Sequence, residues 1–208
     1  MAFLIPDNLK SRKDVPNAIR TAARAFDLGL DEDVQVWYEP LYDANDEKPH
    51  FVVFIPAAGI VVLEMLEVKR RGILGVLRGR IRIEREGREV EIENPLARAK
   101  RLAEALNDRI SAEPRLEGVS IPVVYGAILA FMSEQDVLET GIDKIIPKES
   151  YILKQDIEAA MTGQAGARLE KIFAGMLNSL KELNLSEQQL KVIRGLIQPE
   201  TIISGTKS

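Results

Sequence analysis

The chain has 208 residues, a formal net charge of -4, 46% hydrophobic residues and no cysteine. This length suits one α/β domain with an extension, or two small domains. The lack of cysteine excludes a disulfide scaffold and a thiolate metal site, and it suits a cytoplasmic protein. Because no apolar run approaches the ~20 residues that span a bilayer, we expect no membrane segment.

The first part of the chain predicts one helix and three strands. Apolar residues at helical spacing predict a helix over 15–29, with Asp14 as its cap. Alternation of apolar and polar residues predicts a strand over 34–41. Two apolar strands follow at 51–55 and 59–69, joined by a tight turn.

The middle of the chain predicts a hairpin followed by a helix. Residues 72–77 are apolar and favour a short core helix, or else a loop that touches DNA or a partner. Alternation on two arms predicts a hairpin over 80–93 that turns at Glu86-Gly87. Asn94 is a typical helix cap and the next residue is proline, so a helix is expected from there to about residue 110.

The later elements and the domain boundary follow from similar signals. We expect a strand over about 119–131, and a short strand followed by a short helix within 150–162. The segment "TGQAGA" at 162–167 is rich in breakers, and the pattern changes after it. We therefore divide the chain into an α/β domain at 1–162 and an extension at 163–208, a linker toward a further domain or a helical hairpin.

The extension carries the patterns of two helices. Ser186 and Gln189 form a capping box, and a proline at 199 ends the second helix. A stripe of apolar residues marks the first helix. It consists of Leu169, Ile172, Phe173, Met176, Leu177, Leu180 and Leu183. This stripe must dock on the main domain or on another chain, which leaves a homo-oligomer open.

The strand predicted over 59–69 ends in a carboxylate and an ammonium. Alternate residues of a strand share a face, so Glu67 and Lys69 would point the same way, ~7 Å apart. An ion pair at a strand end is one interpretation. The other is metal-dependent phosphodiester cleavage, in which a carboxylate binds Mg²⁺ or Mn²⁺ and a lysine stabilises charge on the phosphate or positions the attacking water.

The segments "FVVFIPAAGIVVLEMLEVKR" and "NPLARAKRLAEAL", with the hairpin between them, resemble the nuclease-related domain (NERD) of the PD-(D/E)xK phosphodiesterase superfamily. The resemblance covers roughly residues 14–160. It implies a three-layer α/β fold, a mixed sheet flanked by helices as in restriction endonucleases, and metal-dependent hydrolysis of DNA with Mg or Mn. The tail from 185 to 203 resembles the connector that follows such domains in UvrD/Rep-type helicases, which implies a role in DNA processing or defence beside a helicase or a related protein.

The resemblance assigns roles to some residues and fails at others. Glu67 and Lys69 match the catalytic pair, with Glu67 also as a metal ligand. His50 stands where the family has a metal-binding aspartate. Arg98 stands nearest to a family glutamine, and a family glutamate has no match within 15–29.

Three hypotheses account for the missing aspartate. In the first, His50 itself ligates the metal, which suits Mn²⁺ or a softer ion better than Mg²⁺. In the second, another carboxylate substitutes: a β-bulge would bring Glu64 to the side of Glu67, and Asp43, Asp46 and Glu47 lie in the preceding loop. In the third, the site is inactive, and the fold binds nucleic acid or protein without cutting.

Basic residues gather beside this motif and suggest contacts with phosphates. The candidates are Arg70, Arg71, Arg78, Arg80, Arg82, Arg98 and Arg101. A solvated face offset by nearby glutamates is the alternative. The leading functional hypothesis is therefore a metal-dependent DNA phosphodiesterase, and the second is a non-catalytic module that binds nucleic acid or protein.

Overall fold

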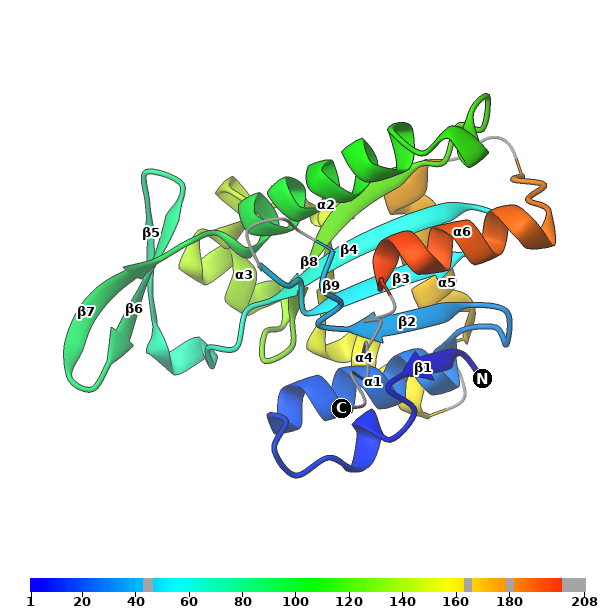
Figure 1. The fold of residues 1–208 in the computed structure, drawn as a ribbon. Helices are drawn as coiled ribbons and strands as arrows, with labels where there is room; N and C mark the ends of the chain where they lie inside the picture. The colour runs from blue at the N-terminus through cyan, green and yellow to red at the C-terminus, as the bar shows by residue number, and fades with distance from the viewer. Residues whose placement is uncertain (43–46, 163–165, 179–181, 200–208) are drawn as a thin grey trace, which may run out of the picture.

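The computed structural model describes residues 1–42, 47–162, 166–178 and 182–199. Its centre is a mixed six-stranded sheet in the order β1-β2-β3-β4-β8-β9 (Figure 1). The strands are β1 (Phe3–Ile5), β2 (Gln35–Tyr38), β3 (Phe51–Ile55), β4 (Gly59–Met65), β8 (Val123–Leu129) and β9 (Tyr151–Leu153). The β2-β3 and β3-β4 pairs are antiparallel, and the β1-β2, β4-β8 and β8-β9 pairs are parallel.

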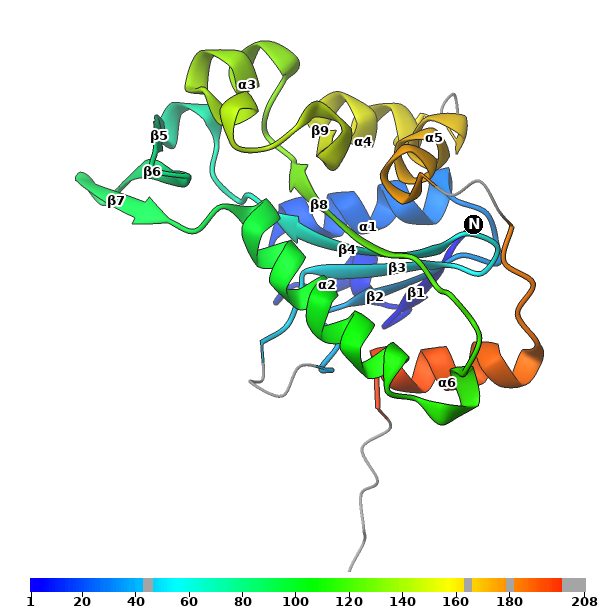
Figure 2. The same cartoon turned by 90° about the horizontal axis from the view of Figure 1, so that it is seen from above.

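Helices cover both faces of this sheet, as Figure 2 shows. The helices are α1 (Asn17–Gly29), α2 (Pro95–Ser111), α3 (Glu134–Thr140), α4 (Lys154–Met161), α5 (Gly166–Leu177) and α6 (Glu187–Ile197). Short 3₁₀ turns lie at Leu9–Ser11, Arg70–Gly72, Pro114–Leu116, Ile142–Lys144 and Lys148–Ser150. The expected α/β class, with a mixed sheet between helices, is confirmed.

Alternation along β3 and β4 supplies two separate cores. On one face, Val53 and Leu63 pack with α1, α4 and α5. On the other face, Val52 and Val62 pack with α2 and α6. The strands are apolar on both sides because both of their faces are covered.

A second, three-stranded antiparallel sheet projects from this body (Figures 1 and 2). It consists of β5 (Ile73–Leu77), β6 (Arg80–Arg85) and β7 (Arg88–Ile92), and we call it the arm. The hairpin predicted over 80–93 is confirmed, with its turn at Glu86-Gly87. Both turn residues have positive φ, 54° and 73°, as a tight hairpin requires.

Several sequence expectations are corrected. The segment 72–77, predicted as a short core helix, forms strand β5. The strand predicted over 59–69 ends at Met65. Asp14 does not cap α1, whose N-cap is Pro16, and it pairs instead with Arg12. Strands expected over 34–41 and 119–131 are shorter than predicted, and β1 and α3 were not predicted.

The two C-terminal helices are present but do not form a hairpin on one surface. Leu169 and Phe173 of α5 are fully buried in the core shared with α1. Val192 and Ile193 of α6 are buried on the opposite face, against α2. The apolar stripe of the first helix therefore docks on the chain's own sheet. Leu180 and residues 163–165 lie outside the described residues. The domain boundary expected at 162–167 stays a prediction.

Candidate functional site

His50 and Glu64 face each other where β3 begins and β4 ends. The antiparallel register pairs Phe51 with Leu63, so the next pair outward is His50 with Glu64. Glu64 lies on the same face of β4 as Val62, beneath α2, and is 2% exposed. The resemblance expects an aspartate at position 50, and the carboxylate that the register places opposite this position is Glu64 rather than Glu67.

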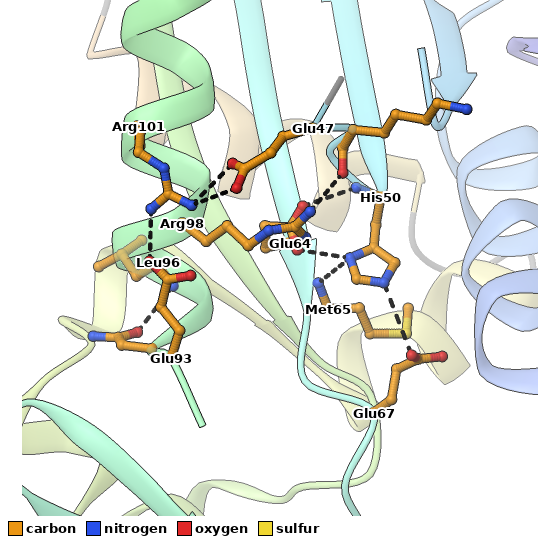
Figure 3. A network of polar contacts seen from close by, with 11 residues as sticks. Glu47, His50, Glu64, Met65, Glu67, Glu93, Leu96, Arg98 and Arg101 are labelled. Carbon is orange, nitrogen blue, oxygen red and sulfur yellow. Dashed lines mark hydrogen bonds and ion pairs between the residues drawn. The ribbon is translucent and has the colours of Figure 1, made fainter. Parts of the chain in front are cut away.

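The buried Glu64 carboxylate is held by two cationic side chains and by the backbone (Figure 3). Its Oε1 accepts a hydrogen bond of 3.0 Å from the His50 backbone N–H. Its Oε2 lies 2.8 Å from His50 Nδ1 and 2.5 Å from Arg98 Nη1. A buried carboxylate is costly unless it is paired, and these contacts are what allows Glu64 to stand in an apolar strand.

Arg98 reaches Glu64 from the first turns of α2. The Asn94 side chain accepts a hydrogen bond of 2.9 Å from the Leu96 N–H and so caps the helix, as predicted. One turn later, Arg98 also donates from Nη2 to the Lys48 carbonyl at 3.0 Å. Arg98 was expected among the nucleic-acid contacts. That role stays a prediction. In the structure its guanidinium contacts Glu64, a partner that the sequence alone did not indicate.

Glu67 lies beyond the end of β4 and approaches His50 from the other side. The distance from His50 Nε2 to Glu67 Oε2 is 3.9 Å, and the Glu67 side chain is 43% exposed. Both carboxylates therefore contact one imidazole (Figure 3). Glu67 reaches His50 because the chain leaves the strand after Met65. The β-bulge considered for Glu64 is not found in the register of β3 with β4, which is regular up to Leu63.

The imidazole is held between negative charges. Burial alone would lower the pKa of His50, but hydrogen bonds to Glu64 and Glu67 and their charges raise it from 6.5 to about 9. In turn, the hydrogen bond from His50 lowers the pKa of Glu67. A protonated ring donates from Nδ1 to Glu64, so the Met65 N–H, 3.2 Å from the same nitrogen, cannot also donate to it.

Lys69 does not complete this group. It follows the strand as an exposed residue, and its Nζ lies 5.9 Å from the centroid of the Phe131 ring, a cation–π distance. Among the described residues, no ion pair joins Lys69 to Glu67. The expectation that the two share a strand face is wrong, because neither belongs to the strand.

This donor set suits a divalent metal poorly. Mg²⁺ and Mn²⁺ prefer carboxylate oxygens with free lone pairs. Both oxygens of Glu64 already accept hydrogen bonds, and the Arg98 guanidinium adds a positive charge beside them.

Most of the candidate arginines are paired with acids. Arg80 and Arg82 on β6 lie 3.5 and 3.0 Å from Glu91 and Glu89 of β7. Arg70 pairs with Asp136 and Glu139, and Arg101 with Glu93 and Glu47, the member of the acidic loop that is described. Asp43 and Asp46 lie outside the described residues.

Four arginines of this region stand apart from these pairs. Within the described ranges, no ion pair is found for Arg71, Arg78, Arg85 and Arg88. All four are exposed. They lie in the turn before β5, at the ends of the arm's strands and at the arm's first turn.

No protein-family model, curated protein or solved structure matches the chain. In the described residues, no helix is both long enough and apolar enough to cross a membrane. Two features of the molecule bear on its function: the arm, and the group formed by His50, Glu64, Glu67 and Arg98.

Proposed function

We propose that the protein is a DNA-binding module with a nuclease-like α/β fold, in which the group at the strand ends stabilises structure and does not cut DNA. The observation that carries this proposal is the buried carboxylate of Glu64, whose two oxygens are held by His50 and Arg98. This carboxylate already accepts three hydrogen bonds, and the guanidinium and imidazolium beside it oppose the approach of a metal cation.

The strand register supports the same conclusion. An E-x-K motif read from Glu64 would require a lysine at 66, and that residue is Leu66, which is 3% exposed among apolar neighbours. Relative to the family that the sequence resembles, His50 stands in place of the aspartate and Arg98 in place of the helix glutamine. These two changes fit one another, because Arg98 and His50 together neutralise the carboxylate of Glu64.

DNA binding is supported by the arm and the turn that leads into it. Four cations there, Arg71, Arg78, Arg85 and Arg88, are exposed, and none of them has an ion-pair partner among the described residues. Arginines of this kind pair with phosphates and release counterions, so binding of this kind weakens with salt. The resemblance suggests a helicase or another DNA-processing protein in the cytoplasm as the context of this binding.

The test measures binding and cleavage on the same samples. Fluorescence anisotropy with duplex and single-stranded DNA at rising salt should show binding that weakens steeply, with or without Mg²⁺ or Mn²⁺. Parallel incubation with linear and circular DNA should leave the DNA intact. Metal-dependent cutting that Glu64→Ala or Glu67→Ala abolishes would refute the non-cutting proposal, and an absence of any binding at low salt would refute the binding role.

A metal-dependent nuclease is the second candidate, and one contact favours it. Glu67 is exposed and lies 3.9 Å from His50 Nε2, so one carboxylate at the strand ends is open to solvent. Such a nuclease would need Arg98 to release Glu64. The cleavage assay above, repeated with Arg98→Gln, tests this requirement. The variant removes the guanidinium from Glu64 Oε2, which His50 Nδ1 still contacts, and it should raise metal-dependent cutting if the protein is a nuclease.

A further inference from the structure

A groove of about 1320 Å³ lies along α6, on the far side of the sheet from the arm. Its walls come from the edge strand β1, its neighbour β2, the turn at Pro114–Leu116 and α6. The lining includes Phe3, Trp37, Arg115, Lys191, Arg194 and Leu196. This volume exceeds the ~300–1,000 Å³ of typical small-molecule pockets, so a segment of polypeptide or nucleic acid fits it better.

The groove is positively charged although the chain as a whole carries a net charge of -4. Its lining contains three cations, Arg115, Lys191 and Arg194, and no Asp or Glu. Arg115 shares its charge with Glu113 at 2.6 Å. The other two stand one turn apart on α6 and so face the same way. The positive charge of the groove therefore favours an anionic ligand.

A hydrogen bond fixes the position of the Arg194 side chain. Its Nε donates to the Gln35 Oε1 at 2.9 Å, which fixes the guanidinium against β2 and leaves its terminal nitrogens for another acceptor. The Lys191 side chain is exposed, and among the described residues it has no ion-pair partner. The two cations thus form a rim above the apolar part of the lining.

The remaining lining is apolar and partly open to solvent. Phe3 is 60% exposed, an unusual state for an aromatic side chain near an edge strand. Ile5, Leu196 and Pro199 lie with it along the groove. Trp37 is only 3% exposed and cannot offer its ring face. One exposed ring is too few for the successive stacking platforms by which single-stranded nucleic acids are held.

The edge of the sheet adds polar groups beside the groove. Among the described strands, β1 has only β2 as a neighbour. The Phe3 N–H donates to the Val34 carbonyl at 2.8 Å, so the N–H and C=O of Leu4 point away from the sheet. An extended chain that lies along β1 can bond to them, as in strand addition.

We propose that this groove binds an extended acidic segment of a partner protein, with carboxylates on Lys191 and Arg194 and apolar side chains against Phe3 and Leu196. Carboxylates match the charge, apolar side chains match the rest of the lining, and an extended backbone matches the open edge of β1. This site is separate from the arm, and it does not depend on the DNA-binding role.

The test uses fluorescence anisotropy with a short labelled peptide that alternates aspartate and leucine. The double variant Lys191→Glu/Arg194→Glu should bind it about tenfold more weakly than the wild-type chain. The control Lys13→Glu/Lys171→Glu makes the same change in net charge away from the groove and should bind as the wild type does. A milder variant, Lys191→Gln/Arg194→Gln, should give an intermediate loss and guards against a fold defect, which circular dichroism checks.

Four results would overturn the proposal, and the first three concern specificity. In the first, the groove and control variants lose peptide affinity equally. In the second, a peptide with lysine in place of aspartate binds as well as the acidic peptide. In the third, oligothymidylate displaces the peptide, and the groove variant no longer binds oligothymidylate. The third result would assign the groove to nucleic acid. An undetectable affinity of the wild-type chain for the acidic peptide would likewise reject it.

Discussion

His50 Nδ1 lies 2.8 Å from Glu64 Oε2, and this contact joins the residue before β3 to the penultimate residue of β4. The same imidazole faces Glu67 through its other nitrogen. The only histidine of the chain therefore works as a bridge between two carboxylates, one buried and one exposed. Its charge state decides how much both contacts contribute.

Stability should depend on pH through His50. Its pKa rises from 6.5 in an unperturbed state to about 9 in the folded protein, so the folded state binds more protons between these values. The stabilisation is therefore complete below pH 6.5 and is lost as the pH rises toward 9, by at most roughly 3 kcal/mol. Urea unfolding at a series of pH values measures it.

The matched variant for this prediction is His50→Gln, which removes the titration and keeps a hydrogen-bonding side chain. Its free energy of unfolding should vary less with pH above 6.5 than that of the wild type. A wild-type stability that rises over this interval would contradict the assignment of a protonated His50.

Removal of the Glu64 charge should destabilise the fold. In Glu64→Gln, the guanidinium of Arg98 and the imidazolium of His50 lose their shared partner while both side chains stay largely covered. We expect a loss of about 2–4 kcal/mol in the free energy of unfolding, because an unmatched charge is left behind.

The double variant Glu64→Gln/Arg98→Gln tests the cause. It removes one cation together with the carboxylate, so it should recover part of the stability lost in Glu64→Gln. A double variant whose loss equals the sum of the two single losses would show that the two groups do not interact in the fold.

Salt dependence should separate the arginines on and beside the arm. Arg71→Gln/Arg78→Asn removes two cations without an ion-pair partner in the described residues, and asparagine suits the positive φ of 49° at position 78. The slope of log affinity for duplex DNA against log salt should become shallower by about 2. Anisotropy titrations over a range of salt concentrations give this slope.

The control is Arg80→Gln/Arg82→Gln, which removes the same charge from residues that already pair with Glu91 and Glu89. We expect a smaller change in slope. Equal changes in both variants would mean that only the total charge of this region matters and that the ion pairs on β6 do not restrict its arginines.

Two glycine substitutions should act in opposite directions. Gly175 lies inside α5 with open space where an alanine methyl group would stand, so Gly175→Ala should raise the free energy of unfolding by about 0.5–1 kcal/mol. Gly59 has φ of +142°, and a Cβ there would lie 2.6 Å from the Pro122 carbonyl oxygen. Gly59→Ala should therefore cost about 2 kcal/mol or more.

Urea denaturation followed by circular dichroism measures both glycine variants against the wild type. The Gly59 result also checks the β3-β4 turn, since the close approach to Pro122 arises from the pairing of β4 with β8. A tolerated Gly59→Ala would mean that this turn relaxes readily, and a destabilised Gly175→Ala would mean that the methyl group meets a contact near α5.

Elements with a strong local signal could be predicted from the sequence. The Asn94 cap, the turn at Glu86-Gly87 and the capping box of Ser186 with Gln189 all appear in the structure. Each depends on a few neighbouring residues, whose hydrogen bonds or backbone angles are set locally.

The end of β4 could not be read in the same way. Leu66 continues the apolar pattern past Met65, so the sequence gives no sign that the strand stops and that Glu67 leaves the sheet. For a similar reason the apolar residues 72–77 suggested a core helix, although they form β5 against β6. In both places a tertiary contact, not a local preference, decides the structure.

The partner of Glu64 was the least accessible part of the site. Glu64 lies in the apolar strand predicted over 59–69, where the sequence shows no cation on its face of the strand that could pair with it. Arg98 lies 34 residues further along the chain and was assigned to nucleic acid. Only the packing of α2 over β4 brings Arg98 and Glu64 together. The sequence pattern of neither segment indicates which helix packs on which strand.

The placement of α5 and α6 on opposite faces has a consequence for the cores that they cover. The Leu183 N–H, which precedes α6, donates to the Ala57 carbonyl of the β3-β4 turn at 2.8 Å. The helices α5 and α6 pack on opposite faces of the sheet. Undocking of α6 would expose the core beneath α2, whereas undocking of α5 would expose the core beneath α1. Detachment of the C-terminal part of the chain would thus uncover two separate apolar surfaces, one on each face of the sheet.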